Sequence, residues 1–270
     1  MLGKLLKYDL RALSRVLILA QLPILPLTGI MKHVIIPEIE RHGIDFVLVC
    51  GIAAYLLYLV TASFMTSLYI AVYTYRSLFS DQGYLTLTLP ASPMQHLLSK
   101  CISGSCWMFI NCILTALSIA YIWFAPEIMR FLCTPNGLEF SETFVASLGG
   151  EDPVTFMIWL IALEVISCLT GPVMILGAIC FGQLFNNHRL LWAVIGYTLL
   201  SIITGLFASG YSFRSIYRER INVTGNIELT VNTSAYMTDL MIFAAVLSMI
   251  TALLCFLLSY WQLKKRVNLQ

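Results

Sequence analysis

The stretch Leu240–Leu263 reads LMIFAAVLSMITALLCFLLSYWQL and contains no charged residue. A helix needs about 20 predominantly apolar residues to cross the hydrocarbon core of a bilayer, so this stretch predicts a membrane-spanning helix. The composition agrees, because 59% of the 270 residues are hydrophobic and only 11% are charged. A soluble domain carries about a quarter charged residues. A water-soluble globular fold is therefore excluded.

Five more uncharged runs precede this stretch. They are Val16–Met31, Phe46–Tyr75, Cys101–Pro126, Val165–Asn187 and Leu190–Phe213. The first is short and contains Pro23 and Pro26, so we expect a tilted or kinked crossing there. The chain is thus predicted to be an all-α polytopic membrane protein, a single transmembrane domain of six helices. We place the spans at about 16–36, 46–75, 101–125, 153–184, 190–211 and 240–263.

The lysines and arginines predict the orientation. With both termini in the cytoplasm, the inner side holds Lys4, Lys7, Arg11, Arg15, Arg76, Lys100, Arg189, Lys264, Lys265 and Arg266, and the outer side holds fewer basic residues and most of the acids. This asymmetry satisfies the positive-inside rule, although Arg214, Arg218 and Arg220 oppose it. We therefore expect a multi-pass protein with both ends inside. No small-residue cleavage site follows the first apolar run, so the N-terminus is interpreted as mature sequence.

The N-terminal segment, residues 1–15, has the pattern of an amphipathic helix. One stripe contains Leu2, Leu6, Leu10, Leu13 and Leu17, and another contains Lys4, Lys7, Arg11 and Arg15. Such a helix lies in the membrane interface with leucines toward the acyl chains and basic residues toward anionic headgroups. The alternative is an ordinary basic flank that only sets the topology.

The cytoplasmic connection between the second and third spans, residues 76–100, is long and rich in apolar side chains. Contiguous exposed apolar residues usually mark a binding surface. The residues that we assign to it are Leu78, Phe79, Asp81, Gly83, Tyr84, Leu85, Leu89 and Pro90. Ser92 is placed to cap the following helix, and Pro93 fits its first turn. We predict that a partner protein binds this connection, which we call the docking loop.

The sequence of the docking loop resembles that of a known protein family. The string from Leu78 to Pro90, LFSDQGYLTLTLP, followed by Leu97-Leu98-Ser99-Lys100, resembles the first cytoplasmic loop of ABC transporter permeases of the type-2 exporter class, as found in Firmicutes. The opening MLGKLLKYDL is similar to the N-terminal interfacial helix of the same proteins. Gln82 stands where an acid is common in that family.

This resemblance implies a permease subunit in the bacterial plasma membrane that pairs with a second permease as a homodimer or heterodimer. It implies export of an amphipathic or hydrophobic compound, such as a peptide, antibiotic or lipid-like molecule, with a link to multidrug or peptide resistance. The docking loop would bind a separate ATPase subunit. The chain contains no G-x-x-x-x-G-K-[ST] phosphate loop, so ATP and Mg²⁺ are expected in that partner, and this chain is expected to be neither an enzyme nor a cofactor-binding protein. Membrane lipids are further expected partners, and nucleic acid is not.

Three residues stand out within the predicted fourth span. Glu164 is a carboxylate inside an apolar run, which costs several kcal/mol unless it is paired, protonated or hydrated. Its role is either functional or a structural hydrogen bond to a neighbouring helix. Gly171 and Pro172 interrupt the backbone hydrogen bonds and predict a kink or hinge.

Two outer segments, 127–152 and 212–239, connect the spans. Within the second, Ile221–Val231 alternates around a Gly-Asn pair and has the pattern of a short β-hairpin.

Three other functions compete with the exporter subunit. A proton-coupled secondary transporter would use Glu164, although no internal repeat with paired broken helices is visible. A noncatalytic assembly partner of another permease would share every feature above. A membrane hydrolase is disfavoured, because neither H-E-x-x-H nor G-x-S-x-G occurs.

Overall fold

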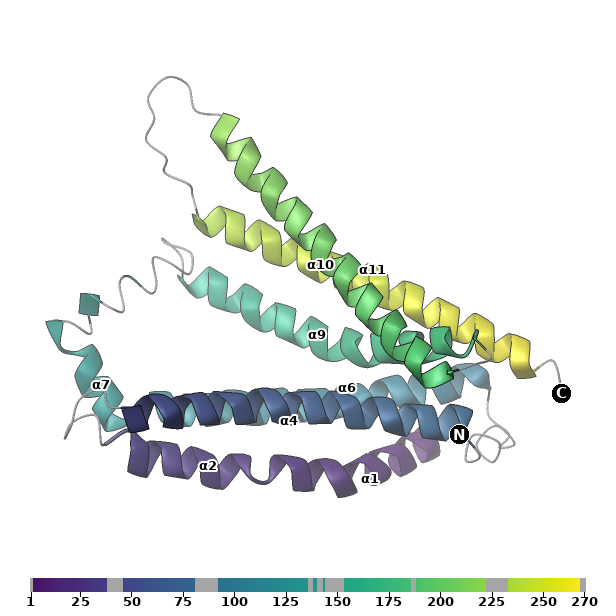
Figure 1. The fold of residues 1–270 in the computed structure, drawn as a ribbon, viewed down its shortest axis with the longest axis horizontal. Helices are drawn as coiled ribbons and strands as arrows, with labels where there is room; N and C mark the ends of the chain where they lie inside the picture. The colour runs from purple at the N-terminus through teal and green to yellow at the C-terminus, as the bar shows by residue number, and fades with distance from the viewer. Residues whose placement is uncertain are drawn as a thin grey trace. The chain divides into compact units, whose positions relative to one another are not determined.

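The computed structural model describes residues 2–37, 46–80, 92–135, 138–139, 143, 153–185, 188–221 and 233–267. All regular secondary structure in these residues is helical (Figure 1). The elements are α1 (Leu2–Gln21), α2 (Ile24–Ile30), the π-helix η1 (Met31–Ile35), α4 (Phe46–Phe79), α6 (Pro93–Trp123), α7 (Pro126–Leu132), α9 (Pro153–Gly182), α10 (Arg189–Ile221) and α11 (Thr233–Val267).

Six helical segments of the described chain are long and apolar enough to cross a membrane. They are Leu2–Ile35, Val49–Phe79, Pro93–Trp123, Met157–Gly182, Arg189–Tyr211 and Asp239–Lys264. The predicted number of spans is therefore confirmed, and the protein has the character of a multi-pass membrane protein. The orientation of the two ends stays a prediction.

The chain divides into two compact units. The N-terminal unit is Met1–Phe140 and the C-terminal unit is Ser141–Gln270. In the N-terminal unit α1 packs against α6 and α4, and in the C-terminal unit α9 packs against both α10 and α11.

The N-terminal helix α1 runs without a break from Leu2 to Gln21. The segment predicted to be interfacial, residues 1–15, thus leads directly into the first predicted span. The chain breaks later, at the turn Leu22–Pro23, because proline has no N–H to donate and its ring clashes with the preceding turn.

The C-terminal part of the leucine stripe of α1 differs from its prediction. Leu13 and Leu17 are 1% and 0% exposed and form a cluster with Ile70 of α4 and Trp107 of α6, so they pack against protein and not against acyl chains. The four basic residues of the other stripe, Lys4, Lys7, Arg11 and Arg15, are all exposed as expected.

Other boundaries extend beyond the predicted spans. The helix α6 begins at Pro93, as the predicted cap at Ser92 requires, although its membrane span was expected only from residue 101. The helix α11 begins at Thr233, and its apolar segment Asp239–Lys264 matches the span predicted at 240–263. The predicted hairpin starts at Ile221, which is the last residue of α10, and its remaining residues 222–231 lie outside the described part of the chain.

Candidate functional site

The start of α6 is built as the sequence predicts. The Ser92 hydroxyl accepts the N–H of Gln95 at 3.3 Å, and the Gln95 side chain accepts the N–H of Ser92 at 3.2 Å. Pro93 occupies the first helical position, where its missing N–H costs nothing. This capping box fixes where α6 begins within the docking loop.

A buried charged cluster lies about two turns after this cap. Asp9 of α1 accepts three short hydrogen bonds: from Lys100 Nζ and Tyr73 Oη at its Oδ1, and from Ser99 Oγ at its Oδ2, each at 2.6 Å. The Lys100 ammonium also lies 4.6 Å from the centre of the Tyr73 ring. We call these four residues the Asp9 anchor. It joins one residue of α1, one of α4 and two of α6.

The anchor is almost closed to solvent. The side chains of Lys100 and Asp9 are 5% and 8% exposed. Burying an ion pair is favourable only when the remaining hydrogen-bonding positions are also satisfied, and here the carboxylate has three donors. The pair therefore fixes the relative position of the three helices at this end of the N-terminal unit.

Sequence reasoning counted Lys100 among the cytoplasmic charges and did not pair it with Asp9. A signal was present, because Asp9 precedes Leu13 and Leu17 at intervals of four and so lies on the leucine stripe instead of the basic one. A carboxylate on the packed face of a helix requires a cation on its neighbour.

The docking loop is described only at its two ends. Leu78 is 3% exposed, which assigns it to packing and not to contact with a partner. Phe79 is half-buried, with its ring 6.5 Å from that of Tyr75. The other predicted docking residues, Asp81, Gly83, Tyr84, Leu85, Leu89 and Pro90, lie outside the described residues.

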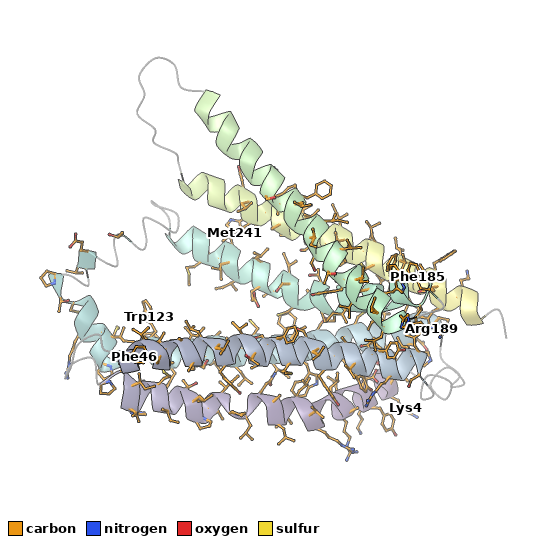
Figure 2. All side chains as sticks on the ribbon, in the orientation of Figure 1. Lys4, Phe46, Trp123, Phe185, Arg189 and Met241 are labelled. Atoms are coloured by element: carbon orange, nitrogen blue, oxygen red, sulfur yellow. The ribbon has the colours of Figure 1, made fainter. Side chains whose placement is uncertain are left out.

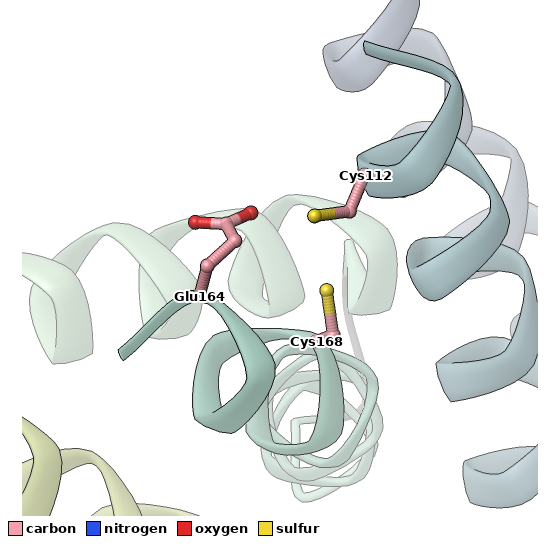
Figure 3. Close-up of side chains that lie close together, drawn as sticks. All are labelled: Cys112, Glu164 and Cys168. Carbon is pink, nitrogen blue, oxygen red and sulfur yellow. The ribbon is translucent and has the colours of Figure 1, made fainter. Parts of the chain in front are cut away.

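The polar and hinge residues of the fourth span all lie on α9. Glu164 is exposed, and Figure 3 shows it one turn from Cys168 on the same helix, whereas Cys112 in that view belongs to α6 of the N-terminal unit. Within the C-terminal unit the Glu164 carboxylate has no hydrogen bond or ion pair with a described residue. Glu164 lies about 16 Å along α9 from its first residue, Pro153.

The predicted hinge does not end the helix. Gly171 is half-buried, Pro172 is buried, and α9 continues past both to Gly182. The backbone groups freed by proline are thus accommodated inside one helix, as membrane helices commonly allow.

Close packing in the C-terminal unit depends on a different glycine. A Cβ atom built on Gly177 of α9 would lie 2.4 Å from the Cβ and 3.0 Å from the Cα of Cys255 on α11. This glycine therefore lets the two backbones approach closely, as small residues do between membrane helices.

The turn from α9 to α10 is short, as predicted, and is aromatic. The rings of Phe185 and Trp192 stack at 4.2 Å, and Phe181 meets Phe185 edge-on at 5.7 Å. Figure 2 places Phe185 and Arg189 at the same end of the C-terminal unit.

Comparison with models of protein families, with curated proteins and with solved structures finds no match for this chain.

Proposed function

We propose that this chain is the membrane-spanning permease subunit of an ATP-driven ABC exporter, with ATP hydrolysed by a separate subunit bound at the docking loop. The proposal is supported by the six apolar helices and by the resemblance of residues 78–90 and 97–100 to the corresponding loop of type-2 exporters. Its cargo is an amphipathic or hydrophobic compound such as a peptide, an antibiotic or a lipid-like molecule. A second permease subunit, identical or related, completes the transporter in a bacterial plasma membrane.

The Asp9 anchor is the observation that best supports this function. Residues 81–91 connect the end of α4 to the start of α6, and the anchor joins both of these helices to α1 within a few turns of the loop. A force applied at the loop would therefore move three helices together instead of bending one. Rigid elements of this kind convert closure of a nucleotide-bound partner into movement of membrane helices.

A loop variant tests the proposal. We expect Phe79→Ala with Tyr84→Ala to reduce the amount of ATPase subunit recovered with the tagged chain by about tenfold or more. The reason is that truncating aromatic residues at the centre of an interface costs about 2 kcal/mol or more of binding free energy. The measurement is quantitative mass spectrometry of the detergent-purified complex. Tyr197→Ala, which changes an exposed aromatic residue on α10, serves as the control and should leave the recovery unchanged. Equal recovery from all three proteins would contradict the docking assignment.

Glu164 favours the second candidate, a proton-coupled transporter, because its carboxylate is unpaired within its own unit. Under the exporter proposal we expect Glu164→Gln to retain efflux at every pH between 5.5 and 8, since ATP supplies the energy. The measurement is efflux of a fluorescent amphipathic dye from inverted vesicles, with Ser167→Ala as a control one turn away. Loss of efflux in Glu164→Gln, with wild-type efflux that depends on a proton gradient and not on ATP, would favour the secondary transporter.

A further inference from the structure

A second group of charged and aromatic residues lies at the opposite end of the N-terminal unit from the Asp9 anchor. Lys32 of η1 donates a hydrogen bond to the main-chain oxygen of Tyr121 on α6 at 2.9 Å, and its Nζ lies 3.7 Å from the centre of the Tyr121 ring. The neighbouring His33 places Nε2 at 3.2 Å from the Tyr121 hydroxyl. Two basic side chains that follow each other in sequence thus meet the same tyrosine. Figure 2 shows Trp123, two residues further along α6, at the end of the unit remote from Lys4.

The backbone of η1 explains this convergence. Lys32 and His33 lie in a π-helix, whose wider turn separates successive side chains by less than the 100° of an α-helix. Both side chains therefore point toward α6. Single π-helical turns are rare in proteins, and they occur frequently at functional sites.

The Lys32 ammonium has no acidic partner among the residues that the structure describes. No described carboxylate pairs with His33 either, whereas Lys100 at the other end is paired with Asp9. The Lys32 ammonium has three donors, of which the Tyr121 carbonyl takes one. An ammonium at the end of an apolar helix is stabilised by an anion at the membrane surface.

The surface beside this group is apolar and has space. Leu25 and Ile30 are 70% and 48% exposed, and a Cβ atom built on Gly29 would meet nothing within 4 Å. Gly29 lies one turn before His33 on the same face. Trp123 is 49% exposed, as aromatic residues at a membrane–water boundary are. A phosphate at Lys32 and His33 would therefore have room for an attached acyl chain along Leu25 and Gly29.

We propose that Lys32, His33 and Tyr121 form a binding site for the phosphate of an anionic lipid headgroup. Lys32 supplies the charge, and the apolar surface beside Gly29 takes an acyl chain. The His33–Tyr121 pair supplies one further hydrogen bond, from Nδ1–H of His33 when the Tyr121 hydroxyl donates to Nε2, or from the Tyr121 hydroxyl when Nε2–H donates to it. The site is independent of the ATPase docking proposed above, because it lies at the other end of the unit. The same phosphate chemistry would also fit free inorganic phosphate, but the apolar surface favours the lipid.

Lipid binding by the intact chain tests the site. We expect native mass spectrometry of wild-type protein, titrated with phosphatidylglycerol in a neutral detergent, to show one tightly bound lipid that Lys32→Gln weakens about tenfold, because one charge-assisted contact is lost. Lys32→Arg should retain binding, since guanidinium also binds phosphate. Lys264→Gln, which removes an exposed lysine on α11, should retain it as well. Phosphatidylcholine should bind more weakly than phosphatidylglycerol to the wild type and to Lys32→Arg.

Three results would overturn the assignment. One is equal phosphatidylglycerol affinity in the wild type and Lys32→Gln. Another is an equal loss in Lys264→Gln, which would indicate a general effect of charge. The last is stabilisation by inorganic phosphate alone that depends on Lys32, which would identify a site for soluble phosphate instead of lipid. Thermal unfolding of each variant, with Lys32→Arg as the folded reference, separates loss of binding from loss of fold.

Discussion

Asp9→Ala is expected to destabilise the N-terminal unit by about 3–5 kcal/mol, because it leaves the Lys100 ammonium buried without its carboxylate. The hydroxyls of Tyr73 and Ser99 lose their acceptor in the same variant. Thermal unfolding in detergent, followed by tryptophan fluorescence, measures the effect. Lys7→Ala, which removes an exposed charge from the same helix, should change the stability by no more than about 0.5 kcal/mol.

A double variant that lacks both charges distinguishes the contribution of the ion pair to stability from the contribution of packing. Asp9→Leu with Lys100→Met removes both charges, and replacing a buried pair by apolar residues of similar volume is often neutral. We therefore expect the double variant to be more stable than Asp9→Ala alone. If Asp9→Ala unfolds at the wild-type temperature, the anchor does not hold the three helices, and the support that it gives to the proposed function is lost.

Gly177→Ala is expected to separate α9 from α11, with a cost of about 1–3 kcal/mol or more. The added methyl group would lie 2.4 Å from the Cβ of Cys255, well inside van der Waals contact, and the Cys255 backbone at 3.0 Å cannot move aside cheaply. The C-terminal unit has no other helix that packs as extensively on α9 among the described residues. Thermal unfolding of the purified protein measures the loss.

Two further variants make this prediction specific. Gly177→Ala with Cys255→Gly removes the Cβ atom that clashes and should recover part of the stability. Gly205→Ala on α10 adds the same methyl group where nothing lies within 4 Å, so it should be neutral or slightly stabilising through helix propensity. Equal effects of Gly177→Ala and Gly205→Ala would show that the close approach of α9 and α11 is not required.

The number of membrane helices was predictable because it depends on local composition. Five of the six uncharged runs are long enough to cross a membrane by themselves, and a polar backbone in lipid has few alternatives to a helix. The cap at Ser92 and Pro93 was predictable for a similar reason, since both residues act on neighbouring backbone groups.

Contacts between distant parts of the chain were not predictable in the same way. The partners of Asp9 lie at least 64 residues away, so their pairing requires the arrangement of three helices. The leucine stripe of α1 illustrates the problem, because the same pattern suits an acyl boundary or a protein core. Only the position of Asp9 on that stripe distinguishes the two.

The contacts of Lys32 and His33 with Tyr121 could not be predicted from the sequence for another reason. It depends on a π-helix after Pro23 and Pro26, and no pattern of apolar residues predicts that local change of period. No pattern in the sequence assigned a partner to Lys32. The residues of the docking loop between Asp81 and Ala91 stay a prediction from sequence.

The subunit composition of the complex tests the central proposal most directly. The chain is tagged, extracted from its native membrane in mild detergent, and weighed intact by native mass spectrometry. The account predicts a complex with two permease subunits and an ATPase subunit that carries the phosphate-loop motif absent from this chain. A complex of this chain without any nucleotide-binding subunit, under conditions in which the chain stays folded, would contradict it.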